Sequence, residues 1–233
     1  MKNSPLFLLS ILLASALPAF AAYPDAKAAS HAANALGWQR KFDESIAAYD
    51  EAIALATDDK QRIEYALNRA DVLNRAGRKA EAIADLYARA EGKGRDEKIR
   101  LLAKAVDIAK SDWRKLGKDV RKGSAELVVL YGEAFKEAAD PAAKQRIALA
   151  RAGCYDNVGD STNVLACYQA LLDIPDGTYE TKLAALVARA NYFRNRKRAA
   201  EAVAAYDEAI AFSTNAWQQG DYALSRADML VAA

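Results

Sequence analysis

The chain contains an internal repeat, which limits it to folds that use one structural unit several times. When residues 42–73 are aligned without a gap to residues 199–230, 18 of the 32 positions are identical. The longest identical run is Ala-Ala-Tyr-Asp-Glu-Ala-Ile-Ala, which begins at Ala47 and again at Ala204. Chance does not produce this agreement between two distant segments, so both segments predict the same local structure.

Weaker copies of the unit lie between these two segments. The second half of each copy opens on a small or apolar residue, at intervals of 37, 45, 37 and 38 residues: Ser45, Ala82, Leu127, Val164 and Ala202. Periods of this length are typical of helical solenoids. The longer interval predicts an irregular third copy near residues 95–139, with an extra turn or a short helix at residues 112–122.

Each copy has the pattern of two antiparallel helices. In residues 63–76 the apolar positions recur at three- and four-residue steps, as on one face of a helix: Ile63, Ala66, Leu67, Ala70 and Leu73. Gly77 and Gly159 follow first helices of two copies, where a left-handed glycine ends a helix most easily. The chain also has 54 alanines, the best helix former, and no alternating strand pattern. The sequence therefore predicts an all-α fold.

These copies resemble the tetratricopeptide repeat family. The first helices carry a small residue (Ala70, Ala152, Ala190, Ala227), followed three residues later by an aromatic residue or leucine (Leu73, Tyr155, Phe193, Leu230). The second helices carry Glu-Ala-Ile or a similar triplet, as at residues 81–83 and 201–203. The resemblance covers about residues 25–233. It implies one domain over residues 22–233, a right-handed α-solenoid of about five helical hairpins plus a C-terminal helix.

The first 21 residues have the pattern of a secretory signal peptide. Lys2 precedes an apolar run over residues 6–17, and Ala19-Phe20-Ala21 matches the small-residue pattern of a cleavage site. The alternative is a buried N-terminal helix. A cleaved signal predicts an exported protein, periplasmic or secreted, with no further membrane-length segment after cleavage.

Composition narrows the class of function. The net charge is +2, from 33 basic and 31 acidic residues, so bulk charge does not predict a nucleic-acid partner. The basic segments 93–122 and 194–198 have few interleaved aromatic residues, and we interpret them as solvated helix ends and loops. The alternative is that they bind an anionic partner or a polymer of the cell envelope. His31 is the only histidine, which leaves no histidine-built metal site and no Ser-His-Asp triad. We expect no cofactor.

The family resemblance implies a non-catalytic scaffold that binds a protein or peptide in a groove of first helices. The candidate groove residues are polar: Asn34, Asp71, Asn74, Arg75, Asp156, Asn157, Asn191, Arg194 and Asn195. One alternative is a structural envelope-assembly component that oligomerises through its ends, including the apolar C-terminal helix expected over residues 222–233. A further alternative is an enzyme that uses acidic residues without a recognisable motif.

The repeated arginines and the two cysteines each have two interpretations. An arginine precedes the small residue of four first helices: Arg69, Arg151, Arg189 and Arg226. These arginines either line up along a groove and bind an acidic ligand, or pair with acidic residues of neighbouring helices. Cys154 and Cys167 lie on either side of the Gly159 turn. They either form a disulfide, as an exported protein permits, or are two small core residues.

Overall fold

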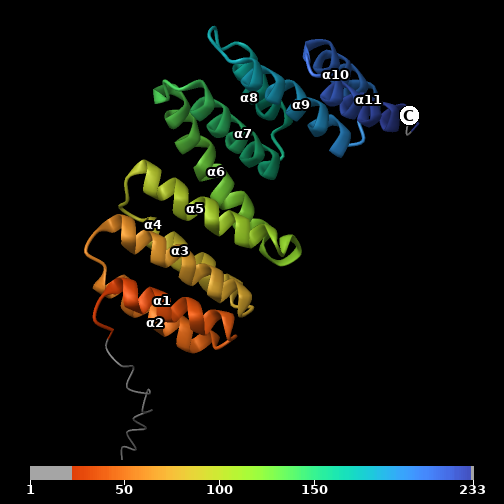
Figure 1. Ribbon diagram of the computed structural model, residues 1–233. Helices are drawn as coiled ribbons and strands as arrows, with labels where there is room; N and C mark the ends of the chain where they lie inside the picture. Colours follow the sequence, from red (N-terminus) through yellow and green to blue (C-terminus); the bar gives the residue numbers. More distant parts are fainter. Residues whose placement is uncertain (1–22, 232–233) are drawn as a thin grey trace, which may run out of the picture. The chain divides into compact units, whose positions relative to one another are not determined.

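The computed structural model describes residues 23–231, and the expected signal peptide lies outside them. These residues form helices joined by short loops, with no strand among them, as Figure 1 shows. In chain order the helices are α1 (Ala26–Trp38), α2 (Phe42–Leu55), α3 (Asp59–Arg75), α4 (Lys79–Ala90), α5 (Arg95–Lys110), α6 (Trp113–Glu137), α7 (Pro141–Val158), α8 (Ser161–Leu172), α9 (Tyr179–Asn195), α10 (Ala199–Phe212) and α11 (Ala216–Val231). The all-α prediction is confirmed for this part of the chain.

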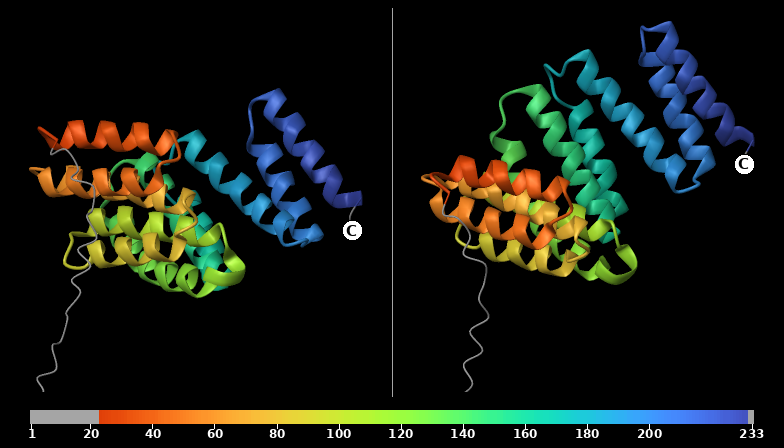
Figure 2. Two further views of the ribbon diagram at one scale, coloured as in Figure 1. Left: turned by 90° about the horizontal axis from the view of Figure 1, so that it is seen from below. Right: turned by 60° about the horizontal axis from the view of Figure 1, so that its bottom comes forward.

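The chain divides into two compact units, and the division falls inside α3, between Val72 and Leu73. The first unit contains α1, α2 and most of α3, and α1 packs against α2. In the second unit each helix from α4 to α10 packs against the next helix along the chain. Figure 2 shows these helices of the second unit from two further directions. Packing between sequence neighbours is the arrangement expected of a helical repeat.

Four of the hairpins share one turn geometry. A residue one or two positions after the end of the first helix has positive φ, and it is glycine at two of the four positions: Arg40 (62°), Gly77 (79°), Gly159 (82°) and Lys197 (57°). The next backbone N–H then donates to a carbonyl five residues earlier, for example from Arg78 to Leu73 at 2.8 Å and from Arg198 to Phe193 at 3.0 Å. This bond is the helix end that a left-handed residue makes. The predicted turns at Gly77 and Gly159 are confirmed.

The third hairpin differs from the others. Helix α5 ends at Lys110 without a left-handed residue, and α6 runs for 25 residues, whereas the other second helices have 12 to 14. The surplus residues expected at 112–122 therefore form extra turns at the beginning of α6 rather than a separate helix. Gly123 of α6 lies so close to α4 and α5 that an added Cβ would be 2.5 Å from Val106 and 2.6 Å from the Tyr87 hydroxyl.

Small residues allow the helices of the second unit to approach one another. Ala152, Ala190 and Ala202 are buried together with Tyr206 and Val164 in a core cluster that joins α7, α8, α9 and α10. Tyr222 and Met229 of α11 pack against the same cluster. Within residues 23–231, every helix is too short or too polar to span a bilayer.

Candidate functional site

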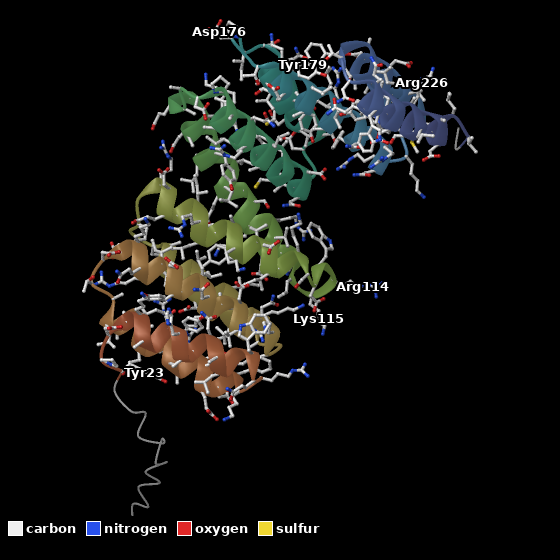
Figure 3. The ribbon with its side chains drawn as sticks, viewed as in Figure 1. Tyr23, Arg114, Lys115, Asp176, Tyr179 and Arg226 are labelled. Carbon is white, nitrogen blue, oxygen red and sulfur yellow. The ribbon has the colours of Figure 1, made fainter. Side chains whose placement is uncertain are left out.

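A cavity of about 620 Å³ lies between α9 and α11 in the second unit, and we call it the α9–α11 groove. Binding pockets for small molecules and peptide side chains are typically about 300–1,000 Å³. Helix α9 contributes an apolar floor that includes Leu183 and Val187, and α11 contributes Gln218 and Tyr222. Tyr179, labelled in Figure 3, lies where α9 begins. The groove therefore combines apolar surface with polar groups.

The sequence of α9 places one side of the helix in this groove. Thr178 caps the helix, and its hydroxyl oxygen accepts a hydrogen bond from the Thr181 backbone N–H at 3.2 Å. Residues four apart lie on one face of a helix. The lining residues of α9 follow this spacing: Tyr179, Leu183, Val187 and Asn191.

The α10–α11 loop is fastened to the first turn of α9. The ring of Tyr179 stacks on Phe212 with 5.4 Å between ring centroids, and its hydroxyl oxygen accepts from the Thr214 backbone N–H at 3.0 Å. Hydrogen bonding with Ser213 and Thr214 lowers the pKa of Tyr179 below its ordinary value. These contacts hold one end of the groove in a fixed shape.

Asn191 is the last α9 residue along the chain that lines the groove, and a residue of α10 fixes the orientation of its side chain. Its Oδ1 accepts a hydrogen bond from the hydroxyl of Tyr206 at 2.8 Å, and Tyr206 is buried. The amide nitrogen makes no hydrogen bond within residues 23–231, so it remains a donor for a ligand. Glu180 supplies a carboxylate acceptor on the same helix. An amide donor and a carboxylate acceptor above an apolar floor can bind a peptide main chain and its side chains.

Two other predicted groove residues make contacts inside the protein. Asp156 accepts a hydrogen bond from Arg196. The guanidinium of Arg196 also lies over the ring of Tyr192, with 4.3 Å between the guanidinium carbon and the ring centroid. Asn157 donates from Nδ2 to the Ser124 hydroxyl of α6 at 3.0 Å. Asp156 therefore joins α7 to the turn after α9, and Asn157 joins α7 to α6. Neither side chain lines the α9–α11 groove.

The remaining predicted residues also lie outside this groove. In the first unit Asn34 is exposed and Asp71 is half-buried. In the second unit Asn74 and Arg194 are half-buried, and Arg75 and Asn195 are exposed. Asn191 is thus the predicted residue that the structure places in the groove. Sequence reasoning missed Tyr179, Leu183, Val187, Gln218 and Tyr222, although the four-residue spacing along α9 would have pointed to three of them.

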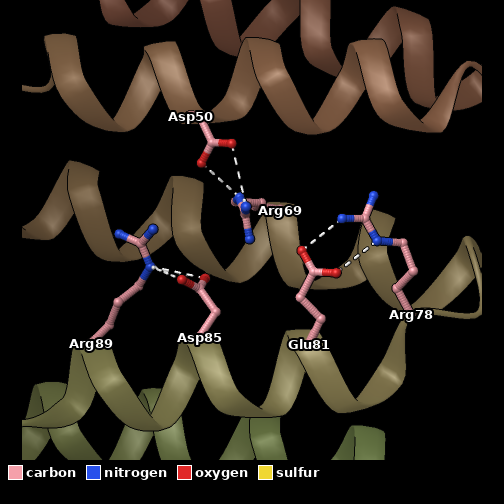
Figure 4. Close-up of polar contacts among 6 residues, drawn as sticks. All are labelled: Asp50, Arg69, Arg78, Glu81, Asp85 and Arg89. Atoms are coloured by element: carbon pink, nitrogen blue, oxygen red, sulfur yellow. Dashed lines mark hydrogen bonds and ion pairs between the residues drawn. The ribbon is translucent and has the colours of Figure 1, made fainter. Parts of the chain in front are cut away.

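Three of the four repeated arginines pair with acids of neighbouring helices. In the first unit Arg69 pairs with Asp50 (Figure 4), and the distance from Nε to Oδ1 is 2.8 Å. In the second unit Arg226 Nε lies 2.5 Å from Asp207 Oδ1. Arg189 pairs with Glu208. These pairs support the structural interpretation of the three arginines. Arg151 has different neighbours.

Cys154 and Cys167 are free, buried thiols in this structure. Cys167 belongs to the core cluster of α7–α10, whereas Cys154 does not. Two residues apart on a helix, Ala152 and Cys154 point in different directions, and it is Ala152 that shares the cluster with Cys167. Burial raises the pKa of Cys154 to about 11. Residues 23–231 contain no group of three or more histidines, cysteines or acids that could hold a metal ion.

Comparison of the chain with protein-family models and with curated proteins finds no match.

Proposed function

We propose that this protein is an exported, right-handed solenoid of the tetratricopeptide type that binds a peptide or a protein segment without catalysing a reaction. The observation that carries the proposal is the α9–α11 groove, where a first helix of one repeat faces the first helix of the next across about 620 Å³. Stacked helical hairpins leave such extended surfaces, and proteins of this architecture use them for binding.

The lining of the groove specifies the chemistry of the ligand. Leu183 and Val187 would contact apolar side chains, while the Asn191 amide would donate to a main-chain carbonyl. The Glu180 carboxylate would accept from a backbone N–H or pair with a basic side chain. The proposed ligand is therefore a short segment with apolar side chains and no acidic residue opposite Glu180.

The test is selection of 12-residue peptides from a displayed random library, followed by affinity measurement with purified protein variants. We expect Ala184→Arg to weaken binding of the selected peptides by about tenfold or more, because the long side chain fills the groove. Ala200→Arg adds the same charge at an exposed position of α10 outside the groove and serves as the matched control. Equal affinity of both variants and the parent protein would refute the proposal.

A second candidate function is assembly through α11, and a specific observation favours it. Trp217, Leu224 and Val231 recur at seven-residue intervals on α11, and they are 75%, 69% and 91% exposed. Met229 packs against the core cluster, but Leu230 remains 52% exposed. These three residues would bury their apolar surface against a second copy of α11. Residues at seven-residue intervals form the contact between two helices of a coiled coil.

A further inference from the structure

The repeat register shows that Arg151 is missing an acid that the corresponding arginines have. Asp50 lies 19 residues before Arg69, and Asp207 lies 19 residues before Arg226. The residue 19 positions before Arg151 is Gly132, inside the same Tyr-x-Glu-Ala pattern. Glycine therefore stands at the position that is aspartate in the other two copies, whereas the arginine 19 residues later is still present.

The other source of an acid is also absent. Arg189 pairs with Glu208, which follows it by 19 residues. The residue that follows Arg151 by 19 positions is Ala170. Both positions that supply a carboxylate in other copies thus carry a residue without one.

The structure gives Arg151 hydrogen-bond partners but no counter-ion. Its Nε donates to the Val128 carbonyl at 3.0 Å, and Nη2 donates to the Tyr155 hydroxyl at 3.1 Å, with the Tyr155 ring 5.3 Å from the guanidinium carbon. The guanidinium lies against Gly132, where an added Cβ would be 2.8 Å from Nη2. Nη1 donates to no atom of residues 23–231. A half-buried guanidinium therefore keeps a free N–H edge without a neutralising carboxylate.

Arg151 also lines a small cavity, which we call the Arg151 pocket. Its volume is about 100 Å³, and its lining comes from Phe135 of α6, Arg151 and Tyr155 of α7, and Ala170 and Cys167 of α8. A single water needs about 10–15 Å³, so the pocket has room for a group of several heavy atoms. The Tyr155 hydroxyl accepts from Arg151 and keeps its own hydrogen, which makes it a second donor. Asn163 also lines the pocket, but its Nδ2 donates to Asp160 at 2.6 Å.

The next repeat provides an internal comparison. A cavity between α8 and α10 contains Arg189 together with Glu208, and there the charge is already neutralised. Arg151 and Arg189 occupy matching positions in consecutive first helices, so the difference lies in the missing acid. Arginine presents a planar pair of N–H donors that matches the two oxygens of a carboxylate.

We propose that the Arg151 pocket binds a carboxylate from outside the chain, held by the Arg151 guanidinium and the Tyr155 hydroxyl. The carboxylate takes the role that Asp50, Asp207 and Glu208 have in the other copies. The Arg151 pocket is separate from the α9–α11 groove, and its ligand is acidic, whereas the groove excludes an acidic residue opposite Glu180.

The test is a titration of the protein followed by NMR of the arginine Nε–Hε groups. Sodium acetate represents a free small carboxylate, and glutamate blocked at both backbone ends represents an acidic side chain of a partner. Acetamide and sodium chloride are the neutral and ionic-strength controls. We expect a saturable shift of the Arg151 signal, assigned by its loss in Arg151→Lys, and no saturable shift of the Arg189 signal, because Arg189 is already paired.

Variants that supply the acid inside the chain make the test decisive. Gly132→Asp and Ala170→Glu should each weaken acetate binding by about tenfold or more, since the new carboxylate competes for Arg151. Ala170→Gln adds a side chain of similar size without charge, so it measures the effect of size alone, and we expect it to bind acetate more tightly than Ala170→Glu does. Saturation by acetate and blocked glutamate supports an acidic side chain as the ligand, and saturation by acetate alone supports a free small carboxylate. No saturable shift of Arg151, or equal binding by Ala170→Glu and Ala170→Gln, would overturn the proposal.

Discussion

The side-chain amide of Asn157 in α7 donates a hydrogen bond to the hydroxyl oxygen of Ser124 in α6, with 3.0 Å between Nδ2 and Oγ. Ser124 is completely buried. Asn157 therefore joins two helices in the interior of the second unit. The family resemblance, in contrast, places it among the candidate groove residues.

Replacement of Asn157 should affect stability rather than binding. Asn157→Ala leaves the buried Ser124 hydroxyl with one partner fewer, and we expect the free energy of unfolding to fall by about 1–2 kcal/mol. Asn195→Ala removes an exposed side chain and should change it by less than about 0.5 kcal/mol. Urea unfolding followed by circular dichroism measures both. Equal stability of the two variants would contradict the interior role of Asn157.

Two glycines inside helices should respond in opposite directions to alanine. At Gly123 the new Cβ would collide with Val106 and Tyr87, so Gly123→Ala should destabilise the protein by about 1–3 kcal/mol. Gly153 is exposed in α7 with nothing within 4 Å of a new Cβ, so Gly153→Ala should stabilise it by about 0.5–1 kcal/mol. Thermal unfolding of the two variants checks the signs. A stabilising Gly123→Ala would refute the close packing of α4, α5 and α6.

The turn between α9 and α10 should gain stability from glycine. Lys197 has a φ of 57°, at the position that Gly77 and Gly159 occupy in their hairpins. A left-handed conformation costs a residue with a Cβ about 1–2 kcal/mol, of which part is offset by the greater freedom of glycine in the unfolded chain. Lys197→Gly should therefore raise the free energy of unfolding by up to about 1 kcal/mol, and Gly159→Ala should lower it. Loss of stability in Lys197→Gly, measured by urea unfolding, would be the contrary result.

Stability should fall in alkaline solution. Burial raises the pKa of Cys154 from 9.0 to about 11, and that of Tyr87 and Tyr168 from 10.0 to about 12. These groups are neutral in the folded state, so their contribution is complete below pH 9 and is lost as the pH rises from about 9 to about 12. Urea midpoints at pH 8, 9 and 10 should decrease, and Cys154→Ala should flatten the decrease. Identical slopes for both proteins would show that Cys154 does not contribute.

Self-association through α11 is open to direct measurement. We expect light scattering to report a dimer or larger species at high micromolar concentration, since Trp217, Leu224 and Val231 form an exposed apolar stripe. The double variant Leu224→Glu with Val231→Glu should be monomeric, because the new charges would be buried without partners in the assembly. Ala200→Glu is the control at an exposed position of α10. A parent protein that is monomeric at this concentration would exclude this assembly.

Periodicity in the sequence predicted much of the fold, because each helix packs through residues that recur every three or four positions. The length of the sequence repeat predicted the positions of all five hairpins, and Gly77 and Gly159 predicted two of the turns correctly. The sequence did not predict that Lys197 would adopt the same conformation without being glycine. The sequence also did not predict which structure the additional residues of the third copy would form, since they can lengthen α6 or form a separate helix.

The candidate site was harder to predict, because polarity does not reveal which neighbour a side chain meets. Asp156, Asn157 and Asn191 are all polar residues of first helices, yet Arg196 and Ser124 bind the first two. The apolar floor of the groove, Leu183 and Val187, resembles core residues in sequence. Only the geometry of α9 and α11 distinguishes a lined cavity from a packed interior.

Photo-crosslinking from Gln218 shows whether a peptide binds between α9 and α11. A photoreactive phenylalanine analogue at Gln218, which lines the groove, is compared with the same analogue at the exposed Ala200 of α10. Binding in the groove predicts that a library-selected peptide is crosslinked from Gln218 to a degree that saturates with peptide concentration, and that Ala200 gives no crosslink. Crosslinking from Ala200 with none from Gln218, or equal crosslinking from both, would contradict it.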